Sequence, residues 1–179
     1  MKHILIFIFC FTNYNVFCQK LNFTDKKEWR KNLKQMLKDD QFYRSKISKQ
    51  NILSNDSLWI LQSKNDSINK EKFVQLTNKF GYPSLKRIGN QNSVVLILHF
   101  TLEKDFVQLF PLFNNELKKG NMPPLDYAIW YDRCQIMMKK STFYGAYGKK
   151  TFCSPELEEI NEKRSSIGLE KLLADPNCK

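Results

Sequence analysis

Histidine is scarce in this chain of 179 residues, which has only His3 and His99. Two histidines cannot supply an H-E-x-x-H motif at this separation, and no cysteine pair has the close Cys-x2-4-Cys spacing of a structural zinc site. A glycine-rich phosphate loop and a nucleophile elbow are also missing. The best-known sequence signatures of metal and phosphate chemistry are therefore absent, and we predict neither a metal site nor a cofactor.

Arginine is sparse as well, since only five of the 29 basic residues are arginine. The formal charge of +11 raises the question of a nucleic-acid or anionic-surface role. Fork-shaped recognition of phosphates and bases favours arginine, however, and the lysines are scattered through every segment instead of forming one stripe. We interpret the charge as solvated helix faces and predict no nucleic-acid partner.

No hydrophobic run near the N-terminus is long enough to cross a bilayer. The run Ile4 to Phe11 spans eight residues, whereas a membrane-spanning helix needs roughly 20. It follows Lys2 and precedes a more polar stretch that ends at Cys18, which is the order of a secretory signal peptide. We predict a signal peptide over 1–18, cleavage before Gln19, and an exported protein, periplasmic or secreted, without a transmembrane anchor.

Two other interpretations of this segment remain open. A lipoprotein would carry its lipid on Cys10 or Cys18, but each follows a Phe where such sites prefer a small residue. A buried N-terminal strand would also suit a run rich in Ile and Phe. We rank both below the cleaved signal.

Removal of the signal would leave three cysteines, an odd number that cannot pair completely: Cys134, Cys153 and Cys178. In an oxidising compartment one disulfide can form, for example between Cys134 and Cys153 across the intervening turn. The alternatives are a buried free thiol at Cys134 and an exposed, unpaired Cys178 on the C-terminal tail.

The remainder of the chain, 19–179, has the length and composition of one folded domain. Apolar residues recur at helical spacing, and cap and stop residues mark the helix ends. The expected helices run from Asp25 to Tyr43 or beyond, from Ser54 or Asp56 to Phe80, from Asn92 or Ser93 to His99, from Lys104 to Lys118, from Pro124 onward, and from Pro155 to a point before Gly168.

Three segments are compatible with more than one local structure. The run that leads to His99 is apolar on all sides and would also suit a buried strand, but its cap favours a helix. Pro111 should kink its helix or mark the true first turn. Thr142–Tyr144 and Lys150–Phe152 flank a turn from Gly145 to Gly148, which predicts a hairpin. The predicted fold is a mainly α, single compact helical domain of about five or six helices with a small β-hairpin near the C-terminal third.

Several polar residues stand where polar residues are awkward. His99 closes an apolar run, and Asp132 and Arg133 lie inside an aromatic helix. His99 could act as a general base, Asp132 could orient it, and Arg133 or Arg44 could hold an anionic group. The structural interpretation is a capped core imidazole beside buried ion pairs that fix helix packing. The further binding candidates are Arg44, Asp40, Asp66, Tyr144 and Arg164.

These residues belong to an ordered set of motifs over about Leu37 to Leu172. The motifs are Asp40-Gln41 with Tyr43-Arg44, Asp66 and Asn69, Phe80-Gly81-Tyr82-Pro83 with Gly89, His99, Leu109 with Pro111-Leu112, Ala128 with Asp132-Arg133, Tyr144-Gly145, and Asn161 with Arg164 and Gly168-Leu169. In their order and spacing the chain resembles a bacterial family known as domain of unknown function 6624. The resemblance implies no established activity. It implies that the awkward polar residues form one recurring pattern, although the family's Y-G-T-Q motif reads Tyr144-Gly145-Ala146-Tyr147 here.

Two functions follow as expectations. The first is a binding or interaction module of the cell envelope, whose partner is an envelope protein or a small ligand. The alternative is a small, hydrolase-like acid–base enzyme that uses His99 with Asp132 and Arg133.

Overall fold

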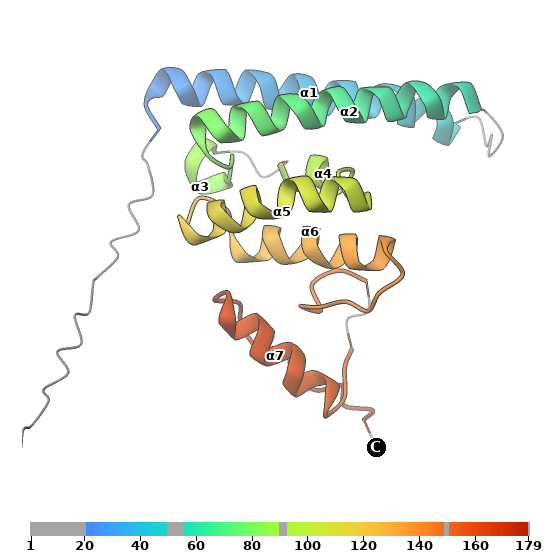
Figure 1. Ribbon diagram of the computed structural model, residues 1–179, viewed down its shortest axis with the longest axis vertical. Helices are drawn as coiled ribbons and strands as arrows, with labels where there is room; N and C mark the ends of the chain where they lie inside the picture. The colour runs from blue at the N-terminus through green and yellow to red at the C-terminus, as the bar shows by residue number, and fades with distance from the viewer. Residues whose placement is uncertain (1–20, 50–55, 90–92, 149–150, 179) are drawn as a thin grey trace, which may run out of the picture.

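A computed structural model describes residues 21–49, 56–89, 93–148 and 151–178 (Figure 1). The described residues form seven helices, which are α1 (Phe23–Lys49), α2 (Asp56–Phe80), α3 (Leu85–Ile88), α4 (Ser93–Ile97), α5 (Glu103–Lys118), α6 (Pro124–Met137) and α7 (Glu156–Ser166). The predicted signal peptide and its cleavage site lie outside these residues. No helix within them is both long and apolar enough to span a membrane.

The two longest helices, α1 and α2, form an antiparallel hairpin that lies across one side of the molecule (Figure 1). The side chain of Asn22 caps α1 by accepting the N–H of Asp25 at 2.8 Å. Trp29 of α1 is fully buried and meets Phe73 of α2 edge to face at 5.4 Å. Burial of each such side chain contributes about 1.5–3 kcal/mol. Packing of the inner faces of α1 and α2 therefore stabilises this hairpin more than the helix propensity of its polar outer residues does.

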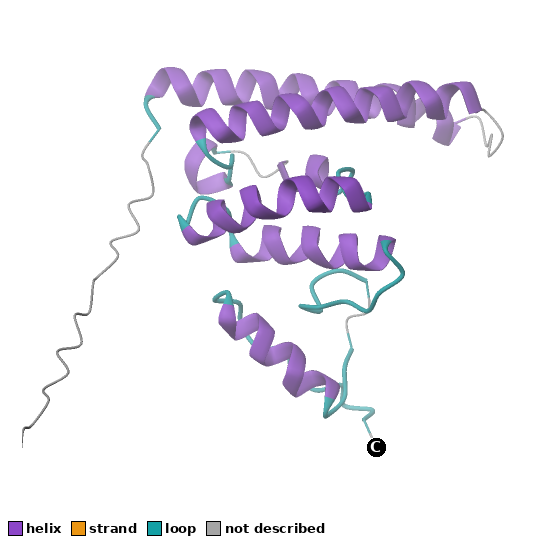
Figure 2. Ribbon diagram, in the orientation of Figure 1, coloured by secondary structure: helices purple, strands orange, loops and turns teal. Residues whose placement is uncertain are grey.

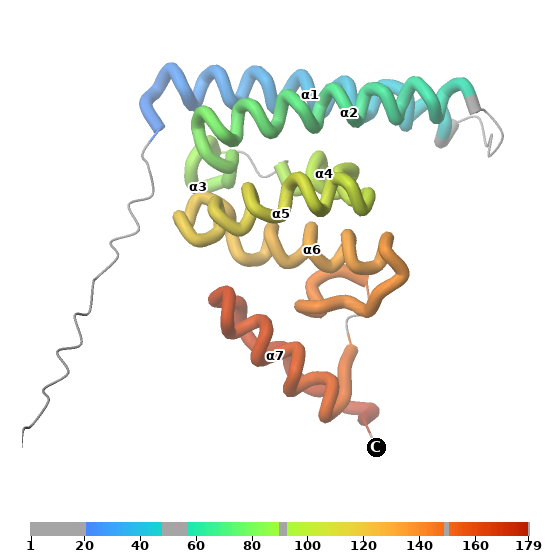
Figure 3. The backbone as a smooth tube through the Cα atoms, viewed as in Figure 1, coloured from blue at the N-terminus to red at the C-terminus, as the bar shows by residue number. Residues whose placement is uncertain are grey.

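The helices α5 and α6 form the next layer, with α4 between them and the hairpin, and α7 crosses below α6 (Figures 1 and 3). Trp130 of α6 is fully buried and packs against Phe113 of α5 at 4.7 Å. Its indole N–H donates to the carbonyl of Phe100 at 3.0 Å. Because His99 directly precedes Phe100, this bond fixes the turn that carries the histidine.

The mainly helical prediction is confirmed, with differences in detail. The apolar run after Ser93 is a helix as expected, but α4 ends at Ile97 and leaves His99 in the following turn. The segment between α2 and Gly89, where no helix was predicted, contains the one-turn helix α3, which raises the number of helices above five or six. Pro111 lies inside α5 and does not mark its first turn.

The predicted β-hairpin near the C-terminal third is wrong. Residues 143–148 form a chain of bends, and no strand occurs in the part of the chain that the structure describes (Figure 2). Lys150 lies outside that part. The reason is Asp132, whose side chain is 0 % exposed and accepts four backbone N–H groups of this loop. Donors that bind a carboxylate are not available to a partner strand.

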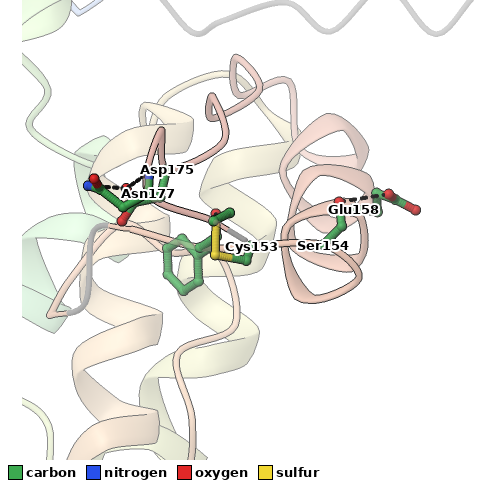
Figure 4. The surroundings of a disulfide bond; sticks show 7 residues. Cys153, Ser154, Glu158, Asp175 and Asn177 are labelled. Atoms are coloured by element: carbon green, nitrogen blue, oxygen red, sulfur yellow. Dashed lines mark hydrogen bonds between the residues drawn. A yellow bond between two sulfur atoms is a disulfide. The ribbon is translucent and has the colours of Figure 1, made fainter.

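The disulfide joins Cys153 to Cys178, with 5.5 Å between their Cα atoms (Figure 4). The pairing of Cys134 with Cys153 is therefore wrong, as is the unpaired Cys178, whereas the buried free thiol at Cys134 is confirmed. The tail folds back beside the disulfide, where the N–H of Asp175 donates to the carbonyl of Phe152 at 3.2 Å. The C-terminal segment is thus tied to the chain just ahead of α7.

Candidate ligand-binding site

The site begins with an aspartate and an arginine that lie one turn apart on α1. Asp40 is 1 % exposed, and Arg44 donates from Nε to its Oδ1 at 3.1 Å. Gln41 donates to the other carboxylate oxygen of Asp40 at 2.6 Å. Arg44 also donates from Nη2 to Oδ2 of Asp66 on α2 at 2.6 Å. One guanidinium therefore bridges two carboxylates and two helices, which is how a buried carboxylate is tolerated.

His99 approaches the same carboxylate from the turn after α4. Its Nε2 lies 3.6 Å from Oδ1 of Asp40, and its side chain is 22 % exposed. Burial lowers the pKa of His99 below its usual 6.5; the Asp40 carboxylate opposes this effect, and the Arg44 and Arg133 charges reinforce it. The imidazole is therefore neutral at pH 7, with an acceptor nitrogen available for chemistry or binding.

One face of α2 carries further polar groups at intervals of four residues. Gln62, which is 1 % exposed, donates from Nε2 to Oδ1 of Asp66 at 2.7 Å. Its own Oε1 is buried, and the described residues provide no hydrogen-bond partner for it. Lys70 donates to Oδ1 of Asp105 at 2.5 Å, and Asp105 also accepts the N–H of Leu102 at 3.3 Å at the start of α5. The same ion pair thus joins α2 to α5 and caps α5.

These groups border a small pocket between α2, the turn after α4 and the start of α5. It has a volume of about 220 Å³. We call it the His99 pocket, and its lining consists of Trp59, Gln62, Ser63, Asp66, Ser67, Lys70, His99, Phe100, Leu102, Lys104 and Asp105. His99 therefore links the buried Asp40–Arg44–Asp66 network to a space that a ligand can enter.

The structure separates the residues that sequence reasoning grouped together. It brings His99 together with Asp40, Arg44 and Asp66. Asp132 does not orient His99, because both of its oxygens accept backbone N–H groups of the loop 142–148 at 2.6–3.3 Å. Asp40 holds the position beside His99 that we had expected of Asp132.

Arg133 lies near the site but is held from the other side. Its Nη1 donates to the hydroxyl of Tyr147, and its guanidinium lies over the Tyr147 ring, 5.2 Å from the centroid. Its charge still helps to lower the pKa of His99. Arg133 is thus a neighbour of the His99 imidazole, and the loop 142–148 holds the Arg133 side chain in place.

Tyr144 and Arg164 serve the C-terminal part of the fold instead. Arg164 donates from Nη1 to the carbonyl of Tyr144 at 2.9 Å and from Nε to the carbonyl of Glu170 at 2.6 Å. Burial, and to a lesser extent the neighbouring Tyr131 and Asp132, raises the pKa of Tyr144 to about 12. Arg164 therefore ties α7 to the loop 142–148 and the tail, remote from His99 in the bonding network.

Sequence reasoning missed nine of the eleven lining residues of the His99 pocket, among them Trp59, Gln62, Lys70 and Asp105. A signal for two of them was present, because Gln62, Asp66 and Lys70 are spaced four apart and must share one face of a helix. The pairing of Lys70 with Asp105 had no local signal, since 35 residues separate them.

No group of three or more His, Cys, Asp or Glu side chains within the described ranges is placed to hold a metal ion. Comparisons of the chain with models of protein families, with curated proteins and with solved structures found no match. The chemistry of the site itself is therefore the basis for a functional proposal.

Proposed function

We propose that this chain is an exported protein of the cell envelope that binds a small polar ligand in the His99 pocket. The observation that carries the proposal is the position of His99. Its partly exposed imidazole rests against the buried Asp40 at 3.6 Å and lines a pocket of about 220 Å³. A neutral histidine beside a fixed carboxylate offers a ligand a directional hydrogen bond.

Export is supported by two independent features. The N-terminal segment has the order of a signal peptide, and the disulfide between Cys153 and Cys178 is typical of proteins in oxidising compartments. The third cysteine of the mature chain, Cys134, is buried and does not conflict with such a compartment.

The resemblance to the domain of unknown function 6624 family forms part of the proposal. Four of the residues that carry it, Asp40, Arg44, Asp66 and His99, lie within 4 Å of one another in a chain of side-chain contacts, although 59 positions separate the first from the last. At the end of the altered Y-G-T-Q motif, Tyr147 contacts Arg133. The departure from the family pattern thus lies beside the site and suggests a ligand preference particular to this chain.

A ligand screen on the mature protein, residues 19–179, tests the binding proposal. We expect a ligand that raises the melting temperature, and we expect His99→Gln and Asp66→Asn each to weaken its binding at least tenfold. Gln75→Ala, on the exposed outer side of α2, is the control and should bind as the parent does. Binding that both site variants retain in full would contradict the proposal.

The second candidate is an acid–base enzyme, for which the Asp40–His99 contact is the specific observation. A histidine whose pKa is lowered by burial is a free base at pH 7, and a carboxylate against its Nε2 would orient the ring. Asp40 replaces Asp132 in this scheme. Panels of ester, amide and phosphoester substrates would test it, since turnover that disappears in His99→Gln is required, and the absence of any turnover removes the candidate.

A further inference from the structure

The charges that line the His99 pocket balance. Two lysines, Lys70 and Lys104, face two aspartates, Asp66 and Asp105, and the imidazole is neutral. Lys70 and Asp105 are paired at 2.5 Å, and Asp66 is held by Arg44 at 2.6 Å. Apart from Lys104, whose side chain is exposed, the charges of the lining are already paired, so a charged ligand would have to compete with these pairs for its counter-charge while losing its own hydration. The lining therefore favours a ligand without net charge.

Gln62 requires a hydrogen-bond donor. Its amide nitrogen donates to Asp66, whereas Oε1 is buried and has no partner among the described residues. Gln62 is also one of the lining residues of the pocket. A buried acceptor without a donor is costly, so a ligand that donates to it gains more than an ordinary hydrogen bond. Ser63, Ser67 and His99 line the same pocket, and each of these side chains can donate and accept a hydrogen bond. A ligand with several hydroxyl groups matches this mixture.

Trp59 adds an apolar, flat surface. It is 46 % exposed and lines the pocket, whereas Trp29 and Trp130 are fully buried in the core. Phe100 and Leu102 extend the apolar wall. Indole rings present a flat face with an apolar body, which suits the C–H face of a sugar ring. The pocket volume of about 220 Å³ equals about seven liquid waters at ~30 Å³ each, which is room for one ring and not for a chain of them.

We infer that the ligand of the His99 pocket is a neutral, hydroxyl-rich molecule the size of a single sugar ring. It stacks on Trp59 and exchanges hydrogen bonds with the Ser63, Ser67 and His99 side chains. One of its hydroxyl groups donates a hydrogen bond to Oε1 of Gln62, whose amide turns toward the pocket to accept it. This inference rests on the proposed binding function and specifies the class of ligand for that site.

Three panels of probes test the ligand class on the mature disulfide-bonded protein. The first contains glucose, N-acetylglucosamine and myo-inositol, the second acetate and inorganic phosphate, and the third ethanolamine. Because Trp59 is the exposed one of the three tryptophans, quenching of intrinsic fluorescence by acrylamide reports on the pocket. We expect at least one member of the first panel to protect Trp59 from the quencher and to raise the melting temperature.

Variants then locate the binding. Calorimetry should show that Trp59→Ala and Gln62→Met each weaken binding of the neutral probe at least tenfold. Ile60→Ala is the matched control, because Ile60 is an exposed apolar neighbour on α2 that does not line the pocket, and it should bind as the parent does. Trp59 is exposed, so its removal leaves the fold intact even if Gln62→Met does not fold.

The outcomes separate this inference from the function on which it rests. Binding of acetate, phosphate or ethanolamine that His99→Gln abolishes, without binding of any neutral probe, would overturn the ligand class and leave the binding function standing. If no probe of the three panels binds, both the ligand class and the binding function are overturned. Binding of a neutral probe that Trp59→Ala and Gln62→Met do not weaken would place its site elsewhere and overturn the inference.

Discussion

Replacing Asp132 by Asn should destabilise the protein by about 3 kcal/mol. The carboxylate accepts the N–H groups of Phe143 and Tyr144 on one oxygen and those of Ala146 and Tyr147 on the other. An amide keeps only one acceptor, so two of the four bonds are lost and an NH2 group faces two N–H donors. Each hydrogen bond to a charged group contributes about 1.5–3 kcal/mol. The sum is reduced because the freed donors of this half-buried loop regain water.

Thermal unfolding measures the effect, because a loss of about 3 kcal/mol corresponds to roughly 6–12 °C in a domain of this size. Hydrogen exchange should show faster exchange of the same four backbone amides. Asp39→Asn makes the same chemical change on α1, where the half-buried Asp39 carboxylate accepts only from the Gln35 side chain among the described residues, and should cost less than about 0.5 kcal/mol. A loss below about 1 kcal/mol for Asp132→Asn, together with lost ligand binding, would refute the structural assignment and restore Asp132 to the site.

Three further predictions concern His99, the disulfide and the buried thiol of Cys134. Because the pKa of His99 is lowered in the folded protein, the unfolded state binds more protons below pH 6.5, so the stability that a neutral His99 provides is present above that pH and is lost as the pH falls through the folded pKa. The melting temperature of the parent should fall relative to that of His99→Gln between pH 7 and pH 5. NMR of the His99 imidazole in a protein of residues 19–179 should report the lowered pKa directly, and parallel curves for the two proteins would contradict the shift. Cys153→Ser should cost about 3.5 kcal/mol from the entropy of a closed loop of 25 residues, as measured by denaturant unfolding. The Cys134 thiol, whose pKa burial raises to about 12, should stay unlabelled by iodoacetamide until the protein unfolds, and labelling of the native protein at the rate of a free thiol would contradict its burial.

The helices could be predicted because their signals are local. Pro123 and Pro124 open α6, Gly81 and Pro83 follow α2, and apolar residues repeat at helical spacing between such signals. The loop 142–148 could not be predicted, because its alternating apolar residues and glycines also describe a hairpin. The carboxylate that decides its shape lies 11 to 15 residues earlier, inside a different element.

The candidate site was predictable as a set of residues but not as a set of partners. His99 could be selected because it closes an apolar run, and Asp40, Arg44 and Asp66 because they belong to the ordered set of motifs. Which acid meets His99 depends on how α1 and α2 are aligned and how α4 lies across them, and no local pattern records this alignment. Trp59 was not selected as a site residue, because an aromatic residue at helical spacing is ordinarily part of a core.

Asp40 and Asp132 show why a buried acid alone does not mark a site. Both are almost completely buried, and both are adequately hydrogen-bonded. The partners of Asp132 are backbone groups of one loop, which cannot leave without unfolding that loop. The partners of Asp40 are the side chains of Arg44 and Gln41, with His99 nearby, and side chains can rotate toward a ligand and return. A carboxylate satisfied by movable partners beside a pocket can respond to binding, whereas one satisfied by backbone serves only the fold. The different consequences expected for Asp132→Asn and His99→Gln rest on this distinction.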